Sequence, residues 1–404
     1  MLNEASLREF YEHVFPVELL VRWLSYDLGG DSFEEANGLP RESRLRPAAE
    51  AYLARREFCF TLRGDIFTRF RSFTGSSELR AELRRVAPEK IDVGAVYNTR
   101  PHLKQGLAAL TPHERELVFD IDMSDYDAVR LCCSGKEVCK RCWGWLACAM
   151  GVLRRVLVED FGFRFLLPVF SGRRGVHLWV CDRRARRMRD DERAAIVGYL
   201  AALTPRSSRG GVVEDLAQHR AIHPTIAGAL AACVEPAFYA IFVDSEAENP
   251  NNMQHHPAAA KVVLEAVRNA LRRGRGDALA RFERRIATEA VAETGIAWGT
   301  LCRALGNEVE ARDVLRAAQV LLLYPRLDEH VTTRRDHLLK LPFCVHAGTG
   351  LLCCPLRWET LGAFDPQKDA PGLEEIVMNR RYDPAWEGPL REMLQAMQED
   401  PNER

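Results

Sequence analysis

The sequence predicts an α/β fold of the α+β kind: a catalytic domain that carries an inserted all-helical subdomain and a small zinc-binding motif. Three observations predict it. Short apolar runs typical of strands recur between residues 58 and 181 and alternate with helical patterns. From about 190 to 318 the strand signal vanishes and Ala, Arg, Leu and Glu dominate. An apolar segment at Val320 to Asp328 then resumes the first pattern.

The first part of the chain is expected to begin with helices. Leu7 to Leu24 has apolar residues at helical spacing and is interrupted by Pro16, which predicts two short helices. Another helix is expected at 46–54, and Trp143 to Phe161 reads as a long apolar helix. Strands are expected at 58–73, 92–97, 117–123, 165–170 and 176–181.

These patterns divide the chain into four parts: a first catalytic part at 1–190 with a cysteine motif at 132–142, a helical insertion at 191–318, a second catalytic part at 319–390 and a flexible tail at 391–404. Because the insertion interrupts one domain, residues near Asp328 must fold back beside the strand at 117–123.

Two acids lie inside the apolar run Glu116 to Met123. Alternation along a strand places Asp120 and Asp122 on the same face, with Cα atoms roughly 6.5 to 7 Å apart. Their mutual repulsion is relieved by divalent cations, which prefer carboxylate oxygens and can present a phosphate for displacement. The alternative is a solvated or ion-paired couple at a strand end.

A basic turn follows downstream. Ser171 to Cys181 reads as a glycine-bounded turn and a strand, with Arg173, Arg174 and His177 around the turn. Adjacent guanidiniums suit phosphate oxygens, so the turn is interpreted as a triphosphate cradle. The alternative is a β-hairpin with an exposed basic tip. A third acid, Asp328, precedes Lys340 and His346, and taken singly it is better explained as a helix N-cap or a surface acid.

Four cysteines fall within eleven residues: Cys132, Cys133, Cys139 and Cys142. Thiolates this dense suit tetrahedral Zn²⁺, and a closed four-thiolate shell predicts a structural role. The alternative is a set of reduced, unliganded thiols. The other eight cysteines sit in apolar contexts and are expected in the core.

The charge balance limits how nucleic acid is bound. Lys and Arg number 56 against 57 Asp and Glu, so binding must be local. The densest basic run, Arg183 to Arg189, is read as a solvated helix face or as a contact to template or partner. No secretory leader is recognised and no apolar run approaches the ~18 to 20 residues that span a bilayer, so a soluble intracellular protein without membrane contact is expected.

Taken in order, six segments closely resemble the catalytic small subunit of eukaryotic-type DNA primase, in the archaeo-eukaryotic primase superfamily. They are Arg56 to Leu62, Lys90 to Tyr97, the Asp120 and Asp122 strand, Ser171 to His177, Pro325 to Asp328 and Leu338 to His346. The resemblance covers roughly residues 5 to 200 and 320 to 365, and it is weak between them. After Gly350 the family tends to continue with a basic residue, where this chain has Leu351.

The resemblance implies a role for each matching residue. Asp120, Asp122 and Asp328 would be the catalytic acids that hold two Mg²⁺ or Mn²⁺ ions. Contacts to the phosphates of the incoming nucleotide would come from Ser171, Arg173, Arg174, His177, Lys340 and His346. Arg69 and Asp92 would lie on the base and sugar side, and the four cysteines would ligate structural zinc.

The resemblance also implies a function: a nucleotidyltransferase, the DNA-dependent RNA polymerase that makes short RNA primers de novo on a single-stranded DNA template from ribonucleoside triphosphates for DNA replication. Its partners would be the large primase subunit, which carries an iron–sulfur cluster, and the DNA polymerase alpha complex, in the nucleus. One alternative is a catalytically silent primase-like scaffold or nucleic-acid-binding subunit. Another is a glycosyltransferase with an Asp-x-Asp motif, which would need neither the 171–177 turn nor a distant third acid.

Overall fold

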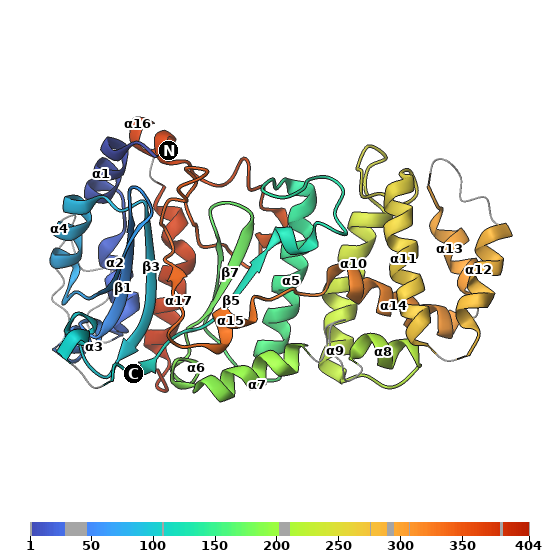
Figure 1. The fold of residues 1–404 in the computed structure, drawn as a ribbon, viewed down its shortest axis with the longest axis horizontal. Coiled ribbons are helices and arrows are strands. Elements are labelled where there is room, and N and C mark those ends of the chain that lie inside the picture. The colour runs from blue at the N-terminus through green and yellow to red at the C-terminus, as the bar shows by residue number, and fades with distance from the viewer. Residues whose placement is uncertain are drawn as a thin grey trace.

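The structure is a computed structural model that describes residues 2–28, 47–106, 109–201, 211–274, 276–288, 295–306, 308–379 and 383–403. Arg46 of the expected helix 46–54, residues 202–210 of the expected insertion and Arg404 of the expected tail lie outside them. The molecule is elongated: a five-stranded sheet stands at one end, a helical subdomain at the other, and a three-stranded sheet lies between them (Figure 1).

The five-stranded sheet has the order β2-β1-β3-β4, with β8 also paired to β3, and the second sheet has the order β5-β7-β6. The strands are β1 (Arg56–Leu62), β2 (Ile66–Arg71), β3 (Lys90–Tyr97), β4 (Pro112–Glu114), β5 (Leu117–Asp122), β6 (Leu166–Phe170), β7 (Gly175–Val180) and β8 (Leu339–Lys340). The single strand expected at 58–73 is therefore a hairpin, in which Gly64 and Asp65 take positive φ values of 82° and 58° at the turn.

Four helices accompany the five-stranded sheet: α1 (Glu4–His13), α2 (Val17–Ser25), α3 (Pro47–Leu53) and α4 (Ser76–Val86). α1 begins after Asn3, whose side chain accepts a hydrogen bond from the Ala5 N–H. Buried residues of α1 and α2, among them Phe10 and Trp23, share one apolar core with Phe58 and Phe60 of β1. Burial of these large aromatic side chains, together with the aliphatic residues of the same core, stabilises this end of the molecule.

The three-stranded sheet buries its two faces in different cores. Leu117, Phe119 and Ile121 face the core that contains helix α5 (Lys140–Glu159), whereas Val118 faces the core shared with α1 and α2. Because side chains alternate, Asp120 and Asp122 continue the face of Val118. The acids therefore stand on the side of this sheet that is turned toward the five-stranded sheet.

A fully buried ion pair joins the two sheets. Arg56 of β1 donates two hydrogen bonds of 2.9 Å to the carboxylate of Glu116, which directly precedes β5, and both side chains are 0% exposed. Tyr26 and Arg115 also donate to this carboxylate. Burial by itself would raise the pKa of Glu116, but the positive charges of Arg56 and Arg115 outweigh it and hold that pKa well below its usual value.

The helical subdomain shares a continuous apolar core with α5 and the three-stranded sheet. Its helices are α8 (Val212–Ala217), α9 (Pro224–Ala229), α10 (Glu235–Phe238), α11 (Pro257–Arg273), α12 (Ala278–Thr288), α13 (Trp298–Leu305) and α14 (Glu308–Leu323). The two helices before it are α6 (Arg183–Arg187) and α7 (Asp190–Ala201). α7 packs near the sheets instead, because its Arg193 donates to the carbonyls of Arg115 and Glu116. α14 extends the helical part to Leu323.

One continuous helical segment of the subdomain, Pro224–Val243, is long and apolar enough by length and composition to cross a membrane. The expectation that no run reaches this length was wrong. The segment contains two π-helical stretches, Leu230–Val234 and Tyr239–Val243, and its Val234 and Phe242 are fully buried in the core. A helix buried in a protein core passes the same test of composition, so the finding is weak evidence for a membrane.

The end of the chain packs onto the rest. Helix α16 (Leu373–Asn379) is followed by α17 (Gly388–Glu399), which buries Leu390 and Met397 in the core of the five-stranded sheet. Beyond it, Asp400 and Glu403 are buried and bonded to arginines of the first part of the chain. Residues 391–403 thus form a helix and an anchored end, where the sequence predicted a flexible tail.

Candidate active site

The carboxylates of β5 face β7. Asp120 lies opposite His177 and Asp122 lies opposite Gly175 in the antiparallel pairing. The Asp120 carboxylate is 3.6 Å from His177 Nε2. The Asp122 carboxylate accepts hydrogen bonds of 2.7 and 2.9 Å from Arg174 Nε and two more from the N–H and hydroxyl of Ser124.

Asp328 reaches the same place from the end of the helical subdomain. Its N–H donates to the backbone carbonyl of Asp120 at 3.1 Å, and it is the N-cap of α15 (Glu329–Thr333), where its side chain accepts from the His330 N–H. The fold therefore places Asp328 next to Asp120, as expected if the segments before and after the helical insertion form one domain. Figure 1 shows α15 beside β5.

The trio creates a negative potential that acts on Asp120. Burial first, and then the charges of Asp122 and Asp328, raise the pKa of Asp120 to about 7. Burial also acts to raise the pKa of Asp122, but the hydrogen bonds from Ser124 and Arg174 outweigh it and lower that pKa. Clustered carboxylates whose ionisation is opposed in this way are suited to bind a hard divalent cation through oxygen.

The basic turn packs tightly through its glycines. Gly172 has a φ of +83°, and a Cβ there would lie 2.8 Å from the Cβ of His346. A Cβ on Gly175 would lie 2.7 Å from the carbonyl oxygen of Ile121. Larger residues would push the turn away from β5 and from His346, so the glycines set the spacing between the basic turn and the acids.

The remaining predicted phosphate contacts surround this turn. Lys340 Nζ donates to the Ser171 carbonyl at 3.1 Å, and the Ser171 hydroxyl accepts from the Gly175 N–H at 3.0 Å. Thus β8, which belongs to the other sheet, places its lysine against the turn. Arg173 lies half-buried on the turn, and its charge acts on His346.

Both histidines of the site are held neutral. Burial first, and then the charge of Lys340, lower the pKa of His177 to about 3 and that of His346 to about 4. The Nδ1 atom of His177 is buried without a hydrogen-bond partner. The positive charge near the turn therefore comes from lysine and arginine, and the imidazoles can offer neutral hydrogen-bonding groups.

Asp92 and Arg69 lie on the facing sheet. Asp92 of β3 is buried, pairs in register with Lys340 and forms an ion pair of 2.9 Å with Lys90. Arg69 of β2 is held by two hydrogen bonds, of 2.9 and 3.2 Å, to the buried carboxylate of Glu57.

Sequence reasoning did not single out Glu57, Lys90 or Ser124. The sequence offered one signal for Glu57: Glu57, Cys59 and Thr61 alternate with the two phenylalanines of the strand. Nothing local in the sequence indicates that Glu57 orients Arg69 or that Lys90 pairs with Asp92, because both contacts depend on how the strands are joined.

The four cysteines of the predicted zinc motif gather at the start of α5. Their sulfur atoms all lie within 4.8 Å of one another, and the Cys139 and Cys142 sulfurs are 3.9 Å apart. Tetrahedral zinc with bonds of about 2.3 Å places its sulfur ligands about 3.8 Å apart, so the cluster fits zinc. Hydrogen bonds from the thiols of Cys132 and Cys142 lower the pKa of Cys139, which favours a thiolate there.

In the described part of the chain no other set of potential metal ligands closes to that spacing. The carboxylates of Asp120, Asp122 and Asp328 lie further apart than the four sulfur atoms. Asp122 is turned to Arg174, and Asp328 is turned to the N–H of His330.

A chain of hydrogen bonds links the cysteine cluster to the acids. Arg130 is fully buried beside the cluster, 3.6 Å from the Cys142 sulfur, and it donates to the Gly135 carbonyl. The same carbonyl accepts from Arg174, which binds Asp122. The cysteine loop therefore helps to fix the guanidinium that binds Asp122 of β5.

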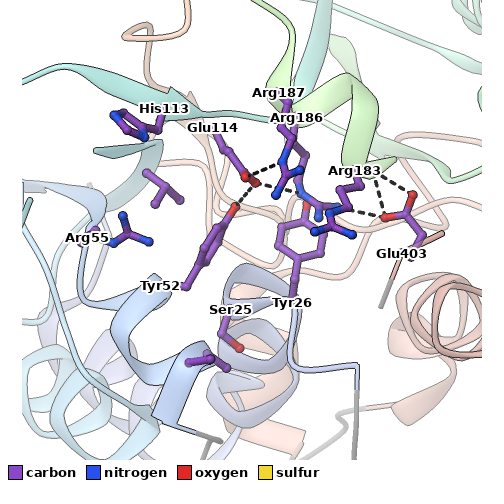
Figure 2. Close-up of a pocket in the computed structure, with 13 residues that line it drawn as sticks. Ser25, Tyr26, Tyr52, Arg55, His113, Glu114, Arg183, Arg186, Arg187 and Glu403 are labelled. Atoms are coloured by element: carbon purple, nitrogen blue, oxygen red, sulfur yellow. Dashed lines mark hydrogen bonds and ion pairs between the residues drawn. The ribbon is translucent and has the colours of Figure 1, made fainter. Parts of the chain in front are cut away.

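Several arginines of the basic run at 183–189 form ion pairs. Arg186 is buried against Glu403 and Glu114, and Arg187 donates to Glu114. The Arg183 N–H donates to Glu403, and Arg189 pairs with Asp191. Figure 2 shows Arg183, Arg186 and Arg187 with Glu114 and Glu403 around a cavity of about 310 Å³ that Tyr52 and Tyr26 also line. Arg186 is buried and anchors Glu403, whereas Arg187 and Arg189 are 55% and 64% exposed, so the run is in part the solvated helix face expected from the sequence.

Comparison with known proteins places the chain in a family. The model of the DNA primase small subunit family matches residues 119–358. The DNA primase small subunit of Drosophila melanogaster is 36% identical over 363 residues, which cover 88% of this chain and 77% of that protein. The Saccharomyces cerevisiae small subunit is 32% identical over 386 residues, with coverage of 93% and 85%.

Among solved structures, the polymerase domain of Mycobacterium tuberculosis ligase D in complex with DNA covers 98% of this chain, with 92% of its own chain covered, a TM-score of 0.38 and 15% identity. This similarity is too low to argue from. The match to the family model and the identity with the eukaryotic subunits are sufficient: the chain belongs to the DNA primase small subunit family. It is accordingly an enzyme of the nucleotidyltransferase type, with a mixed fold of helices and sheets.

Proposed function

We propose that this chain is the catalytic subunit of a DNA primase: a DNA-dependent RNA polymerase that starts short RNA primers on single-stranded DNA. The observation that carries the proposal is the hydrogen bond from the Asp328 N–H to the Asp120 carbonyl, which brings the third acid to the strand that faces the basic turn. Membership of the family supports the class of reaction.

Two Mg²⁺ or Mn²⁺ ions bound by Asp120, Asp122 and Asp328 would supply the activation of the attacking 3′ hydroxyl and part of the charge compensation at phosphorus. The chain's own residues do the rest of the work. Arg173, Arg174 and Lys340 offset the charge of the triphosphate, and the neutral imidazoles of His177 and His346 hydrogen-bond to its oxygens. The Ser171 hydroxyl, already at the turn, is a further polar contact.

Arg174 has a second part in this account. Its guanidinium occupies the Asp122 carboxylate. Asp122 would have to release Arg174 in order to hold a divalent ion with the same oxygens, and the triphosphate would offer the guanidinium new oxygen acceptors. Substrate binding and metal binding would therefore support one another through a single side chain.

On the facing sheet, Asp92 is proposed to hydrogen-bond the ribose hydroxyl and Arg69 to lie near the base of the incoming nucleotide. The four cysteines are proposed to hold structural zinc, which would fix the loop whose Gly135 carbonyl contacts Arg174. The large primase subunit with its iron–sulfur cluster, the DNA polymerase alpha complex and a nuclear location follow by analogy with the eukaryotic relatives.

Incorporation of labelled ATP on a poly(dT) template tests the proposal directly, with and without the large subunit and with Mg²⁺ or Mn²⁺. The wild-type chain should make short ribonucleotide products, and Asp120→Asn should abolish them while the melting temperature is retained. Asp125→Asn is the matched control, because Asp125 is an exposed acid three positions after Asp122. Failure of the wild type to form product under every condition would favour a silent scaffold.

A further inference from the structure

Exposed apolar side chains gather on the edge strand of the five-stranded sheet. The large hydrophobic residues that are exposed in the described part of the chain are Ile66, Phe67, Leu103, Val158 and Met378. Three of them lie on β2 and on η1 (Pro101–Gly106), a short 3₁₀ turn whose His102 is 3.1 Å from Ser72, the residue that follows β2. Phe67 is 65% exposed. Because side chains alternate along a strand, Ile66 and Phe67 lie on opposite faces of the sheet, and Phe67 is the exposed apolar residue of β2 on its own face.

The strand register places Phe67 on the same face as the proposed nucleotide site. Phe67 lies opposite Thr61, and Thr61 lies opposite Lys90. Two residues along the strands, Cys59 lies opposite Asp92, which is itself opposite Lys340. Directly opposed residues share a face, and so do residues two apart. Phe67 therefore stands at the outer border of the sheet face that carries Asp92 and Lys340.

A second aromatic ring, that of Phe70, lies three residues along β2 from Phe67 and has two cations beside it. The Lys104 ammonium is 3.9 Å from the centroid of the Phe70 ring, and the Arg69 guanidinium is 4.9 Å from it. Phe70 has a φ of +63°, a strained value for a phenylalanine, and its N–H donates to the buried Glu57 carboxylate that also holds Arg69. The structure thus maintains a ring between two cations at the edge of the sheet.

We propose that the single-stranded DNA template crosses this edge, stacks a base on Phe67 and passes its phosphates along Arg69 and Lys104. Aromatic side chains combined with a positively charged groove are the general means of binding single-stranded nucleic acid without reading its sequence. Here Phe67 is the exposed ring, and Arg69 and Lys104 supply the positive charge further along the same edge. The chain carries a net charge of −1, so template affinity must come from a local surface such as this one. The exposed Asp65 at the hairpin tip marks where the favourable surface ends.

The proposal rests on the polymerase function proposed above, and it adds the path of the template. A template bound there would also explain why β2 keeps an open edge with an exposed phenylalanine, a feature that otherwise favours aggregation.

Binding of a fluorescent oligo(dT) to the chain, followed by anisotropy, tests the proposal. Phe67→Ala should raise the dissociation constant by about 5- to 150-fold, the effect of losing one stacked base. Phe67→Trp should keep the affinity within about threefold. Met378→Ala removes an equally apolar side chain that is 79% exposed on α16, and it should change nothing. Lys104→Ala should reduce the slope of log affinity against log salt by about one.

Other results would overturn the proposal. If Phe67→Ala binds oligo(dT) as Met378→Ala does, or if it weakens only association with the large subunit, the surface is not a template platform. Binding of labelled ATP to Phe67→Ala should stay unchanged, which separates a lost template contact from a damaged nucleotide site. An inactive wild-type chain would refute the polymerase function. The binding of oligo(dT) could still be measured and would still test the template surface.

Discussion

Replacement of Arg174 by alanine should have opposite effects on nucleotide and metal binding. The side chain binds the Asp122 carboxylate at 2.7 and 2.9 Å, and in our account it moves to the triphosphate when substrate enters. A hydrogen bond to a charged group contributes about 1.5 to 3 kcal/mol, so Arg174→Ala should raise the nucleotide dissociation constant about 10- to 150-fold.

The same change should favour the divalent ion. The Arg174 and Asp122 side chains are 24% and 42% exposed, and solvent screens such a pair to about 1 kcal/mol or less. A cation that no longer has to displace the guanidinium should therefore bind up to about fivefold more tightly in the absence of nucleotide. For the same reason the melting temperature should fall only slightly.

Three measurements on one variant decide the matter: Mn²⁺ binding followed by electron paramagnetic resonance, binding of labelled nucleotide, and thermal unfolding. Arg173→Ala is the matched control, expected to weaken nucleotide binding and to leave Mn²⁺ affinity unchanged. If Arg174→Ala instead loses stability and nucleotide affinity to the same extent and binds Mn²⁺ as the wild type does, the turn is only a hairpin with a basic tip.

Two further predictions concern parts outside the turn. Glu116→Gln leaves the buried charge of Arg56 without its partner and should lower the free energy of unfolding by about 3 to 5 kcal/mol in urea titrations, whereas Glu82→Gln in a half-buried pair should cost about 1 kcal/mol or less. Because the pKa of Glu116 is lowered on folding, its contribution to stability is fully present above the ordinary pKa of 4.5 and declines as pH falls below it. The difference between wild type and variant should therefore be complete at pH 7, and equal stabilities at that pH would contradict the predicted role of the ion pair. Cys139→Ser should reduce zinc from about one ion per chain to near zero by elemental analysis and should also raise the nucleotide dissociation constant, because the loop no longer holds Arg174; a zinc-free wild type would remove the claim.

Local patterns in the sequence predicted what depends on local geometry. A strand has a period of two, so the shared face of Asp120 and Asp122 follows from their spacing, and the glycines of the basic turn indicated its close packing. The density of cysteines likewise indicated a cluster that the structure brings together.

Contacts between distant segments could not be predicted in this way. The pairing of Arg174 with Asp122, of Arg69 with Glu57 and of Arg186 with Glu403 depends on which strands and helices the topology makes neighbours. The tail was misjudged for this reason, since the arginines that anchor Glu403 lie in the first half of the chain. The apolar segment at Pro224–Val243 was not recognised because Glu235 and Pro236 interrupt the apolar pattern, although the helical segment continues through them.

The central claim is that Asp120, Asp122 and Asp328 together hold divalent ions against a nucleoside triphosphate. Titration of Mn²⁺ by electron paramagnetic resonance in the presence of nucleotide, for the wild type and for Asp328→Asn, tests it most directly. We expect two ions per wild-type chain and at least about tenfold weaker binding of one of them in the variant. Identical titrations for the two proteins would contradict it.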